Sequence, residues 1–256
     1  MTIWLTRPKA QAAKTHERLV ALGYESIWSQ PLMEIVPVAG AQQRQKIRGQ
    51  VMDLDLYHIA IFVSQNAVQF AFDVIDDFWP QLPLNTEFFA VGSATARTLT
   101  LHGVNAESGL GEAMDSESLL MLPQLNAVDG LKVVIFRGLG GRTKLADELI
   151  SRGACVDYCE LYERVYPSDC ASALAVSQFG NDSQDIILVY SGESLQNLQR
   201  SILESQKTHV FNTAVVVPGA RVAAMAKSLG FTTIFEAKNA SEEAMITTMT
   251  QACDSL

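Results

Sequence analysis

Residues 136–167 read FRGLGGRTKLADELISRGACVDYCELYERVYP, and residues 5–38 read LTRPKAQAAKTHERLVALGYESIWSQPLMEIVPV. The two stretches align at an offset of 130 residues, with Gly23 on Gly153, Pro37 on Pro167 and Arg7 on Arg137. In each, a helical pattern follows an apolar run, stops at the glycine and leads into an extended segment. The alignment predicts the same strand–helix–strand unit twice in this chain.

A second kind of unit is also repeated. Residues 61–70, IFVSQNAVQF, match residues 188–197, LVYSGESLQN, with Ser64 on Ser191. Further on, AVGSATARTLTLHG (90–103) matches VVPGARVAAMAKSLG (216–230), with Gly92 on Gly219 and Gly103 on Gly230. The two kinds of unit therefore alternate along the chain, each occurring twice.

Short apolar runs alternate with amphipathic stretches almost throughout. Such alternation is typical of parallel sheets with helices on both faces, so we expect the α/β class. The helical pattern over residues 9–22 places five residues near one face, namely Ala13, His16, Leu19, Val20 and Leu22. The predicted strands cover residues 3–6, 26–29, 59–63, 88–91, 132–136, 154–162, 186–190, 214–217 and 232–236.

The repeat leaves two domain divisions open. A plain tandem duplication would place two domains side by side. However, each unit of the first kind ends in an extended segment with a proline, PLMEIVPV (31–38) and LYERVYPS (161–168). Two such linkers, near 31–40 and 161–170, could pair as a two-stranded ladder that carries the chain between domains. Residues 39–167 would then form one domain, and residues 1–38 with 168–256 the other.

Composition narrows the class of protein. The chain has 256 residues, 48% of them apolar and 18% charged, which indicates a globular protein. It has no apolar run long enough to span a membrane and no signal peptide, and its four cysteines form no CxxC pair. We therefore expect a cytoplasmic protein. A net charge of −9 argues against nucleic acid as a partner, and any polyanionic ligand would need a locally basic site.

Six motifs link the chain to a known family. LTRP, FVSQNAV, AVGSATA, FRGLGGR with LADELISRGA, LYERV and YSGESLQNL occur here in the order seen in uroporphyrinogen-III synthases. Each motif is short and weak alone, but their joint order and spacing are specific. The chain therefore resembles that family over nearly its whole length.

The resemblance implies two similar parallel-sheet α/β domains, joined by a two-stranded β ladder, with a ligand cleft between them. It thereby favours the discontinuous domain division. The implied substrate is hydroxymethylbilane, which carries eight carboxylates. The reaction removes water, inverts the terminal pyrrole ring and closes the macrocycle, without a metal or cofactor, in haem and sirohaem biosynthesis. We expect a monomer, with hand-over of the substrate from hydroxymethylbilane synthase as a possible partnership.

The matched motifs fall where strands lead into helices. Ligands of open α/β sheets bind beyond the carboxyl ends of strands, where helix N-termini offer free N–H groups. Arginine can hold a carboxylate through two hydrogen bonds, and small residues allow close approach. The expected substrate-binding residues are Arg7, Pro8, Ser64, Asn66, Gly92, Ser93, Thr95, Arg137, Gly138, Arg142, Ser191, Gly192 and Gly219.

Each of these residues also has a purely structural interpretation. The serines could be helix N-caps only, and Pro8 could simply start its helix. The two arginines of the repeat could lie on the surface. Arg142 and Lys144 are expected in a first helical turn, where a cation opposes the helix dipole, which favours a ligand role. Ser116 and Ser241 are expected as N-caps, and the acidic residues expected at helix starts are Asp115, Glu117, Glu242 and Glu243.

Tyr162 is the catalytic candidate, because the resemblance places the tyrosine of LYER in the cleft. Loss of hydroxide requires a proton donor, and a phenol is protonated at neutral pH. Tyr162 could instead pack in the linker, since the pyrrole nitrogen itself expels the leaving group and the enzyme could act mainly by positioning.

Two other functions stay open. Gly138-Leu139-Gly140 begins a glycine-rich turn, with Asp157 or Glu160 about twenty residues on, as in nucleotide-binding proteins, although Thr143 replaces the third glycine. A non-enzymatic two-lobe binding protein would share the architecture.

Overall fold

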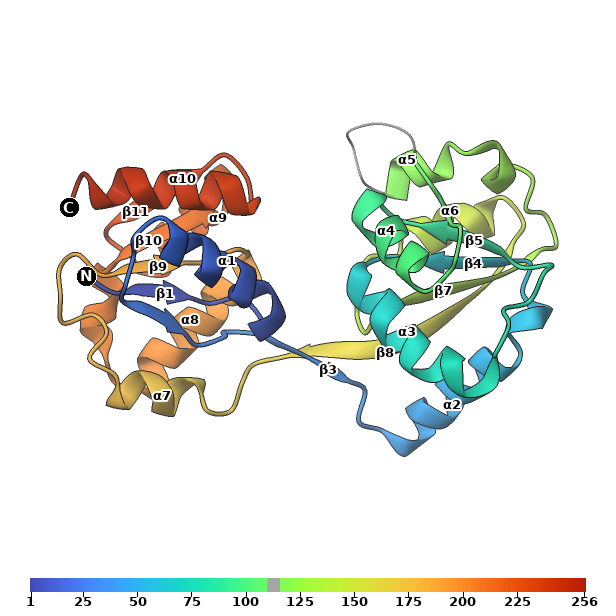
Figure 1. Cartoon of the computed structure of the whole chain (residues 1–256), viewed down its shortest axis with the longest axis horizontal. Helices are drawn as coiled ribbons and strands as arrows, with labels where there is room; N and C mark the ends of the chain where they lie inside the picture. The colour runs from blue at the N-terminus through green and yellow to red at the C-terminus, as the bar shows by residue number, and fades with distance from the viewer. Residues whose placement is uncertain (110–115) are drawn as a thin grey trace. The chain divides into compact units, whose positions relative to one another are not determined.

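The computed structural model describes residues 1–109 and 116–256 of the chain. The chain folds into two compact units, which are coloured by residue number in Figure 1. Unit 1 contains Met1–Ile35 and Val165–Leu256, and unit 2 contains Val36–Arg164. Each unit has its own sheet and its own hydrophobic core.

The sheet of unit 1 has the strand order β11-β10-β9-β1-β2, and every neighbouring pair is parallel. Its helices connect these strands and cover both faces of the sheet. The elements are β1 (Ile3–Leu5), α1 (Lys9–Ala21), β2 (Ile27–Ser29), α7 (Cys170–Val176), β9 (Ile186–Leu188), α8 (Gly192–Glu204), β10 (Ala214–Pro218), α9 (Gly219–Ser228), β11 (Ile234–Ala237) and α10 (Glu242–Cys253).

Alternation of side chains along buried strands builds the two cores of unit 1. Ile3 and Leu5 face a core that includes Leu19 of α1 and Met245 of α10. Trp4, between them, faces the opposite core, which includes residues of α7, α8 and α9. Because successive strand side chains point to opposite faces, a continuous apolar run such as Ile3–Leu5 fits a sheet covered on both sides.

The sheet of unit 2 has the order β3-β8-β7-β4-β5-β6. The strand pairs from β8 to β6 are parallel. Phe62 and Phe136 stack across β4 and β7, with ring centroids 4.6 Å apart. The elements are β3 (Glu34–Pro37), α2 (Ala41–Met52), β4 (Ile59–Phe62), α3 (Gln65–Phe78), β5 (Glu87–Ala90), α4 (Ser93–Leu101), β6 (Glu107–Ser108), α5 (Ser116–Leu120), β7 (Lys132–Gly138), α6 (Lys144–Ser151) and β8 (Cys155–Val165). Short 3-10 helices lie at Leu54–Leu56 and Pro123–Leu125 in unit 2, and at Thr208–Asn212 in unit 1.

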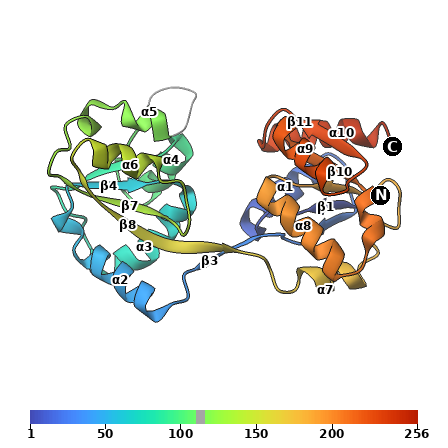
Figure 2. The same ribbon diagram turned by 180° about the vertical axis from the view of Figure 1, so that it is seen from behind.

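In each sheet, strands of the two kinds of sequence repeat pair with each other. In unit 1, β1 of the first strand–helix–strand repeat pairs with both β2 and β9. In unit 2, β4 pairs with β7, which belongs to the second copy of that repeat. The chain passes from one unit to the other within β3 and at the end of β8, and these two strands are neighbours in the sheet (Figures 1 and 2). The Val38 amide donates to the Leu161 carbonyl over 3.2 Å beside them. The expected α/β class with two largely parallel sheets is confirmed.

The predictions for individual strands and helices were only partly confirmed. All nine predicted strands are present, but β6 was not predicted. The predicted face of α1 was only partly right, because Leu19 is buried but Ala13 and Val20 are exposed, and Ala12 and Thr15 are buried instead. The Ser241 cap is confirmed by the Ala244 amide, which donates to its hydroxyl over 3.3 Å. Asp115 lies outside the described residues. No helix in the described ranges is long and apolar enough to cross a membrane.

Candidate active site

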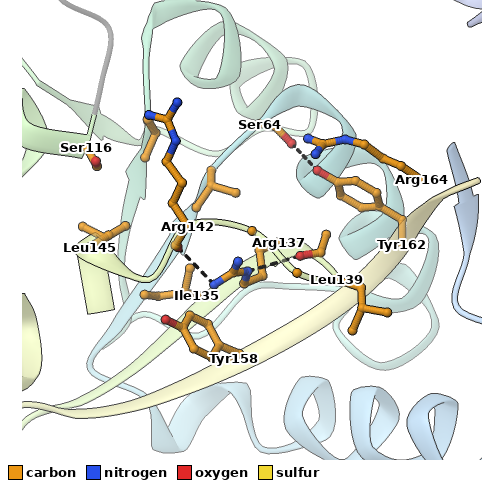
Figure 3. Close-up of a pocket in the computed structure, with 15 residues that line it drawn as sticks. Ser64, Ser116, Ile135, Arg137, Leu139, Arg142, Leu145, Tyr158, Tyr162 and Arg164 are labelled. Atoms are coloured by element: carbon orange, nitrogen blue, oxygen red, sulfur yellow. Dashed lines mark hydrogen bonds between the residues drawn. The ribbon is translucent and has the colours of Figure 1, made fainter. Parts of the chain in front are cut away.

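A pocket of about 510 Å³ lies in unit 2 at the carboxyl ends of its strands (Figure 3). Residues after β4 and β5, the end of β7, the loop before α6 and the last part of β8 surround it. Parallel strands end at the same edge of a sheet, so residues distant in sequence meet there. The lining residues are Val63, Ser64, Val91, Ser116, Ile135, Arg137, Gly138, Leu139, Gly140, Gly141, Arg142, Leu145, Tyr158, Tyr162 and Arg164.

Arg137 is the most buried cation of the pocket, with 4% of its surface exposed. Its guanidinium lies over the Tyr158 ring at 4.4 Å, a cation–π contact. Its Nε donates to the Gly138 carbonyl over 3.2 Å and its Nη1 to the Arg142 carbonyl over 3.3 Å. A Cβ at Gly141 would collide with this guanidinium. The glycine therefore makes room for the arginine.

The pocket is locally basic. Three arginines line it, namely Arg137, Arg142 and Arg164, and no Asp or Glu among the described residues does. None of the three guanidiniums forms an ion pair with a carboxylate of the described ranges. A buried cation is costly unless an anion compensates it, so this arrangement suits an anionic ligand.

The expectation for the start of α6 was wrong in one respect. Arg142 precedes the helix, which begins at Lys144, so its side chain does not oppose the dipole from within the first turn. Lys144 does lie in that turn, but it forms an ion pair with Glu117 that lowers the pKa of this carboxyl to about 2. Lys144 is thus compensated within the protein, whereas Arg142 has no ion pair among the described residues.

Tyr162 is held on three sides. Its hydroxyl lies 3.0 Å from the Ser64 hydroxyl, which also accepts a hydrogen bond from the Ala67 amide over 3.1 Å. The Phe70 ring stacks on the tyrosine ring with centroids 5.4 Å apart. On another side, a Cβ at Gly138 would approach the tyrosine Cε2 to 2.5 Å. Gly138 was expected to let a ligand approach, but the space above it is filled by Tyr162.

Four expected residues of unit 2 do not line this pocket, namely Asn66, Gly92, Ser93 and Thr95. They lie at the N-terminal ends of α3 and α4. Gly92 has φ 83°, a conformation that favours glycine, and Thr95 is 4% exposed. Their positions fit a structural role in the turns, and substrate contact stays a prediction.

The other five expected residues belong to unit 1 and follow three adjacent strands, β1, β9 and β10. Arg7 lies over the Tyr190 ring at 4.5 Å and donates to the Gln11 amide oxygen over 3.1 Å. Ser191 caps α8 by accepting from the Ser194 amide over 3.1 Å. All five residues lie at or just before the start of a helix, where a structural role is sufficient to explain them. They are Arg7, Pro8, Ser191, Gly192 and Gly219.

Sequence reasoning missed Tyr158 and Arg164, which line the pocket from β8. The even spacing of Tyr158 and Tyr162 does not place them on one face, because β8 shifts register opposite Arg137 and Gly138. Tyr158 packs on the core that contains Ile135, whereas Tyr162 stacks on Phe70 of α3. Arg164 was missed because the predicted strand ended at residue 162, whereas β8 extends to Val165.

The nucleotide alternative finds little support in the site. Asp157, the proposed ribose ligand, lies within β8 and accepts a hydrogen bond from the Tyr57 hydroxyl over 2.9 Å. Neither Asp157 nor Glu160 lines the pocket beside the glycine-rich turn. The turn therefore lacks the acidic partner that dinucleotide recognition requires.

Comparisons with known proteins agree with one another. A family model described as uroporphyrinogen-III synthase HemD matches residues 13–247. The uroporphyrinogen-III synthase of Escherichia coli K12 is 34% identical over 256 residues, which cover 96% of this chain and 98% of that protein. The synthase of Salmonella typhimurium is 31% identical over 252 residues, with the same two coverages, 96% and 98%.

Solved structures share the fold. A mutant uroporphyrinogen III synthase from Thermus thermophilus superposes with a TM-score of 0.60 at 15% identity, covering 100% of both chains. The Helicobacter pylori enzyme gives 0.59 at 15% identity, covering 98% of this chain and 99% of the other. These structures are too distant in sequence to indicate more than the fold. The family match over residues 13–247 and the 34% identity to the Escherichia coli enzyme show that the chain belongs to the uroporphyrinogen-III synthase family.

Proposed function

We propose that this protein converts hydroxymethylbilane to uroporphyrinogen III, with loss of water, inversion of the terminal pyrrole ring and closure of the macrocycle. The observation that carries the proposal is the pocket of unit 2, which is lined by a buried tyrosine and by three arginines without ion-pair partners among the described residues. The reaction is inferred from the family to which the chain belongs, and we propose the pocket of unit 2 as its site.

Local charge explains how an acidic protein can bind a polyanion. The chain has a net charge of −9, which repels an octacarboxylate at long range. Inside the pocket the balance is reversed, because guanidiniums line it and carboxylates of the described ranges do not. A buried carboxylate held by an arginine gains a charge-assisted hydrogen bond, which is about twice as strong as a neutral one.

Tyr162 is the proposed proton donor. Ser64 already accepts from the Ala67 amide, so its own proton is available to the Tyr162 oxygen. The phenol proton then passes to the leaving hydroxyl, which departs as water while the pyrrole nitrogen supplies electrons. The phenolate is stabilised by Ser64 and by the N-terminus of α3. It recovers a proton from the pyrrole carbon that forms the new bond.

The loops of unit 1 extend the proposal. Arg7, Ser191 and Gly219 lie where helices begin after adjacent strands, a position that offers free N–H groups to carboxylates. We propose that residues 39–167, and residues 1–38 with 168–256, act as the two domains, both binding the substrate. We also propose that the enzyme is a monomer and receives its substrate from hydroxymethylbilane synthase.

A coupled assay tests the function directly. Hydroxymethylbilane is generated in place, the protein is added, and the oxidised porphyrin isomers are separated chromatographically. Without enzyme the bilane closes to the type I isomer, so a shift to the type III isomer is the expected result. Type I alone from folded protein would refute the proposal. Sedimentation that shows a stable dimer would refute the monomer.

A further inference from the structure

Arg164 is the arginine of the pocket that stands nearest to Tyr162 along the chain. The two residues are two positions apart on β8, so their side chains leave the same face of the strand. Both line the pocket, together with Ser64. Figure 3 draws the Arg164 guanidinium on the side of the Ser64–Tyr162 hydrogen bond, whereas Arg142 lies toward Ser116.

The Arg164 guanidinium is exposed and uncommitted within the described part of the chain. It forms no ion pair there, and no hydrogen bond from it to a described residue occurs. Arg137 differs, because it is buried and donates to two carbonyls of its own loop. At the offset of 130, the residue that matches Arg164 is Glu34, so the repeat carries opposite charges at this position.

This position has a chemical consequence for the proposed reaction. The pyrrole ring that carries the leaving hydroxyl also carries carboxylates. A guanidinium holds a carboxylate through two parallel hydrogen bonds, which fixes orientation as well as position. A carboxylate held at Arg164 would bring its ring, and the hydroxyl on that ring, beside the Tyr162 phenol.

We propose that Arg164 binds a carboxylate of the pyrrole ring whose hydroxymethyl group loses the hydroxyl, and thereby orients that hydroxyl toward Tyr162. The inference rests on the proposed function. Arg164 fixes the reacting ring, while Arg137 and Arg142 bind carboxylates elsewhere on the substrate. Its contribution is to the geometry of the reacting complex, so its loss affects kcat as well as KM.

The test uses the full-length protein in the coupled assay, with Arg164→Gln, Arg164→Lys and the control Arg44→Gln. Arg44 is also an exposed arginine of unit 2, but it does not line the pocket. We expect Arg164→Gln to lower kcat/KM by about 10- to 100-fold, mainly through kcat, as for loss of a charge-assisted hydrogen bond. Arg164→Lys should restore part of this loss, and Arg44→Gln should match the wild type.

A double-mutant cycle with Tyr162→Phe separates orientation from plain binding. If Arg164 acts by placing the ring at Tyr162, the two effects are not additive, and the double variant is little slower than the slower single variant. The corresponding cycle of Arg142→Gln with Tyr162→Phe should be additive. Circular dichroism checks that the variants fold.

Three results would overturn the inference. The first is an Arg164→Gln variant with wild-type kinetics, and the second is a rise in KM with unchanged kcat. The third is strict additivity with Tyr162→Phe. Failure of the proposed function itself is distinguishable, because the wild-type protein would then yield the type I isomer.

Discussion

Unit 1 and unit 2 contain the same repeated elements but differ at one short segment. Helices α1 and α6 end at matched residues, Ala21 and Ser151, yet α1 begins at Lys9 and α6 only at Lys144. Residues 9–13, KAQAA, form the first turn of α1. The matched residues 139–143, LGGRT, form a loop instead.

The physical reason for this difference lies in the glycines. Alanine, lysine and glutamine favour a helix, whereas each glycine costs about 1 kcal/mol there. Gly140 also has φ 72°, which a helix does not allow. Pro8 is the N-cap of α1, three residues after the end of β1, whereas its counterpart Gly138 still belongs to β7. Loss of one helical turn in unit 2 therefore leaves a loop that lines the pocket.

The strands differ as well. β1 and β2 have three residues each, whereas β7 has seven and β8 eleven. The longer strands carry Arg137, Tyr158 and Tyr162 to the pocket. The two copies of the repeat therefore share their turns. They differ in strand length and in the loop of residues 139–143, and unit 2, with the longer strands, contains the arginine-lined pocket.

The largest effect is expected at Tyr162, whose match in the repeat is the buried Leu32. Tyr162→Phe should lower kcat by about 100-fold, because general acid catalysis typically contributes at least this much. The fold should be unaffected, since the ring keeps its contact with Phe70. Stopped-time assays of ring closure give kcat, with Tyr24→Phe in unit 1 as control. A wild-type rate would exclude the acid role.

Arg137 and Arg7 test whether the matched arginines are equivalent. Arg137→Gln should lower kcat/KM by about 30-fold, as expected for the loss of one hydrogen bond to a charged group. Arg7→Gln should have the smaller effect, because Arg7 is only half-buried and is held by Gln11. Steady-state kinetics of both variants measure the difference. Equal values would mean that burial does not distinguish the two units, and two unchanged variants would remove both from the site.

Gly138→Ala tests the space that the end of β7 leaves for Tyr162. The new Cβ would lie 2.5 Å from the tyrosine Cε2, so the ring or the strand must shift. We expect a loss of stability of about 2 kcal/mol, as for other overpacked sites, together with reduced activity. Urea denaturation measures the former. Gly49→Ala in α2 is the matched control, because no atom lies within 4 Å of its new Cβ. A Gly138→Ala variant as stable as Gly49→Ala would contradict this view of the pocket.

Ser64 and Ser191 separate helix capping from catalysis. Each accepts a hydrogen bond over 3.1 Å at the start of its helix, so either change to alanine should cost about 1 kcal/mol of stability. Only Ser64 contacts the hydroxyl of Tyr162. Ser64→Ala should therefore also slow the reaction, by a few fold. Equal kcat values for the two variants would show that the Tyr162 contact does not matter.

The smallest effect concerns the ion pair at the start of α6. Lys144 lowers the pKa of Glu117 from 4.5 to about 2, whereas the matched Lys14 has no ion pair within the described ranges. The stabilisation is present above pH 4.5 and is lost as the pH falls toward 2. Because both groups are exposed, it should be slight and screened by salt. Melting temperatures of wild type and Glu117→Gln should differ at neutral pH and converge in acid. A difference that persists at pH 2 would exclude this cause.

The sequence by itself determined the repeat, the strands and the turns. Gly23 and Gly153 have φ 91° and 90°, and each ends its helix in the same way. Such features depend on a few neighbouring residues, because caps and glycine turns are satisfied locally. The order of six short motifs further indicated the family to which the chain belongs.

Only the tertiary structure decided how the site is assembled. The burial of Arg137 against Tyr158, and the gathering of Ser64 and Tyr162, depend on the register of β8 against β7 and the place of β4 beside it. The buried face of α1 was predicted correctly only at Leu19 for the same reason, since the packing of α1 on its sheet selects the buried face. Local patterns specify elements, whereas long-range strand pairing specifies which side chains meet.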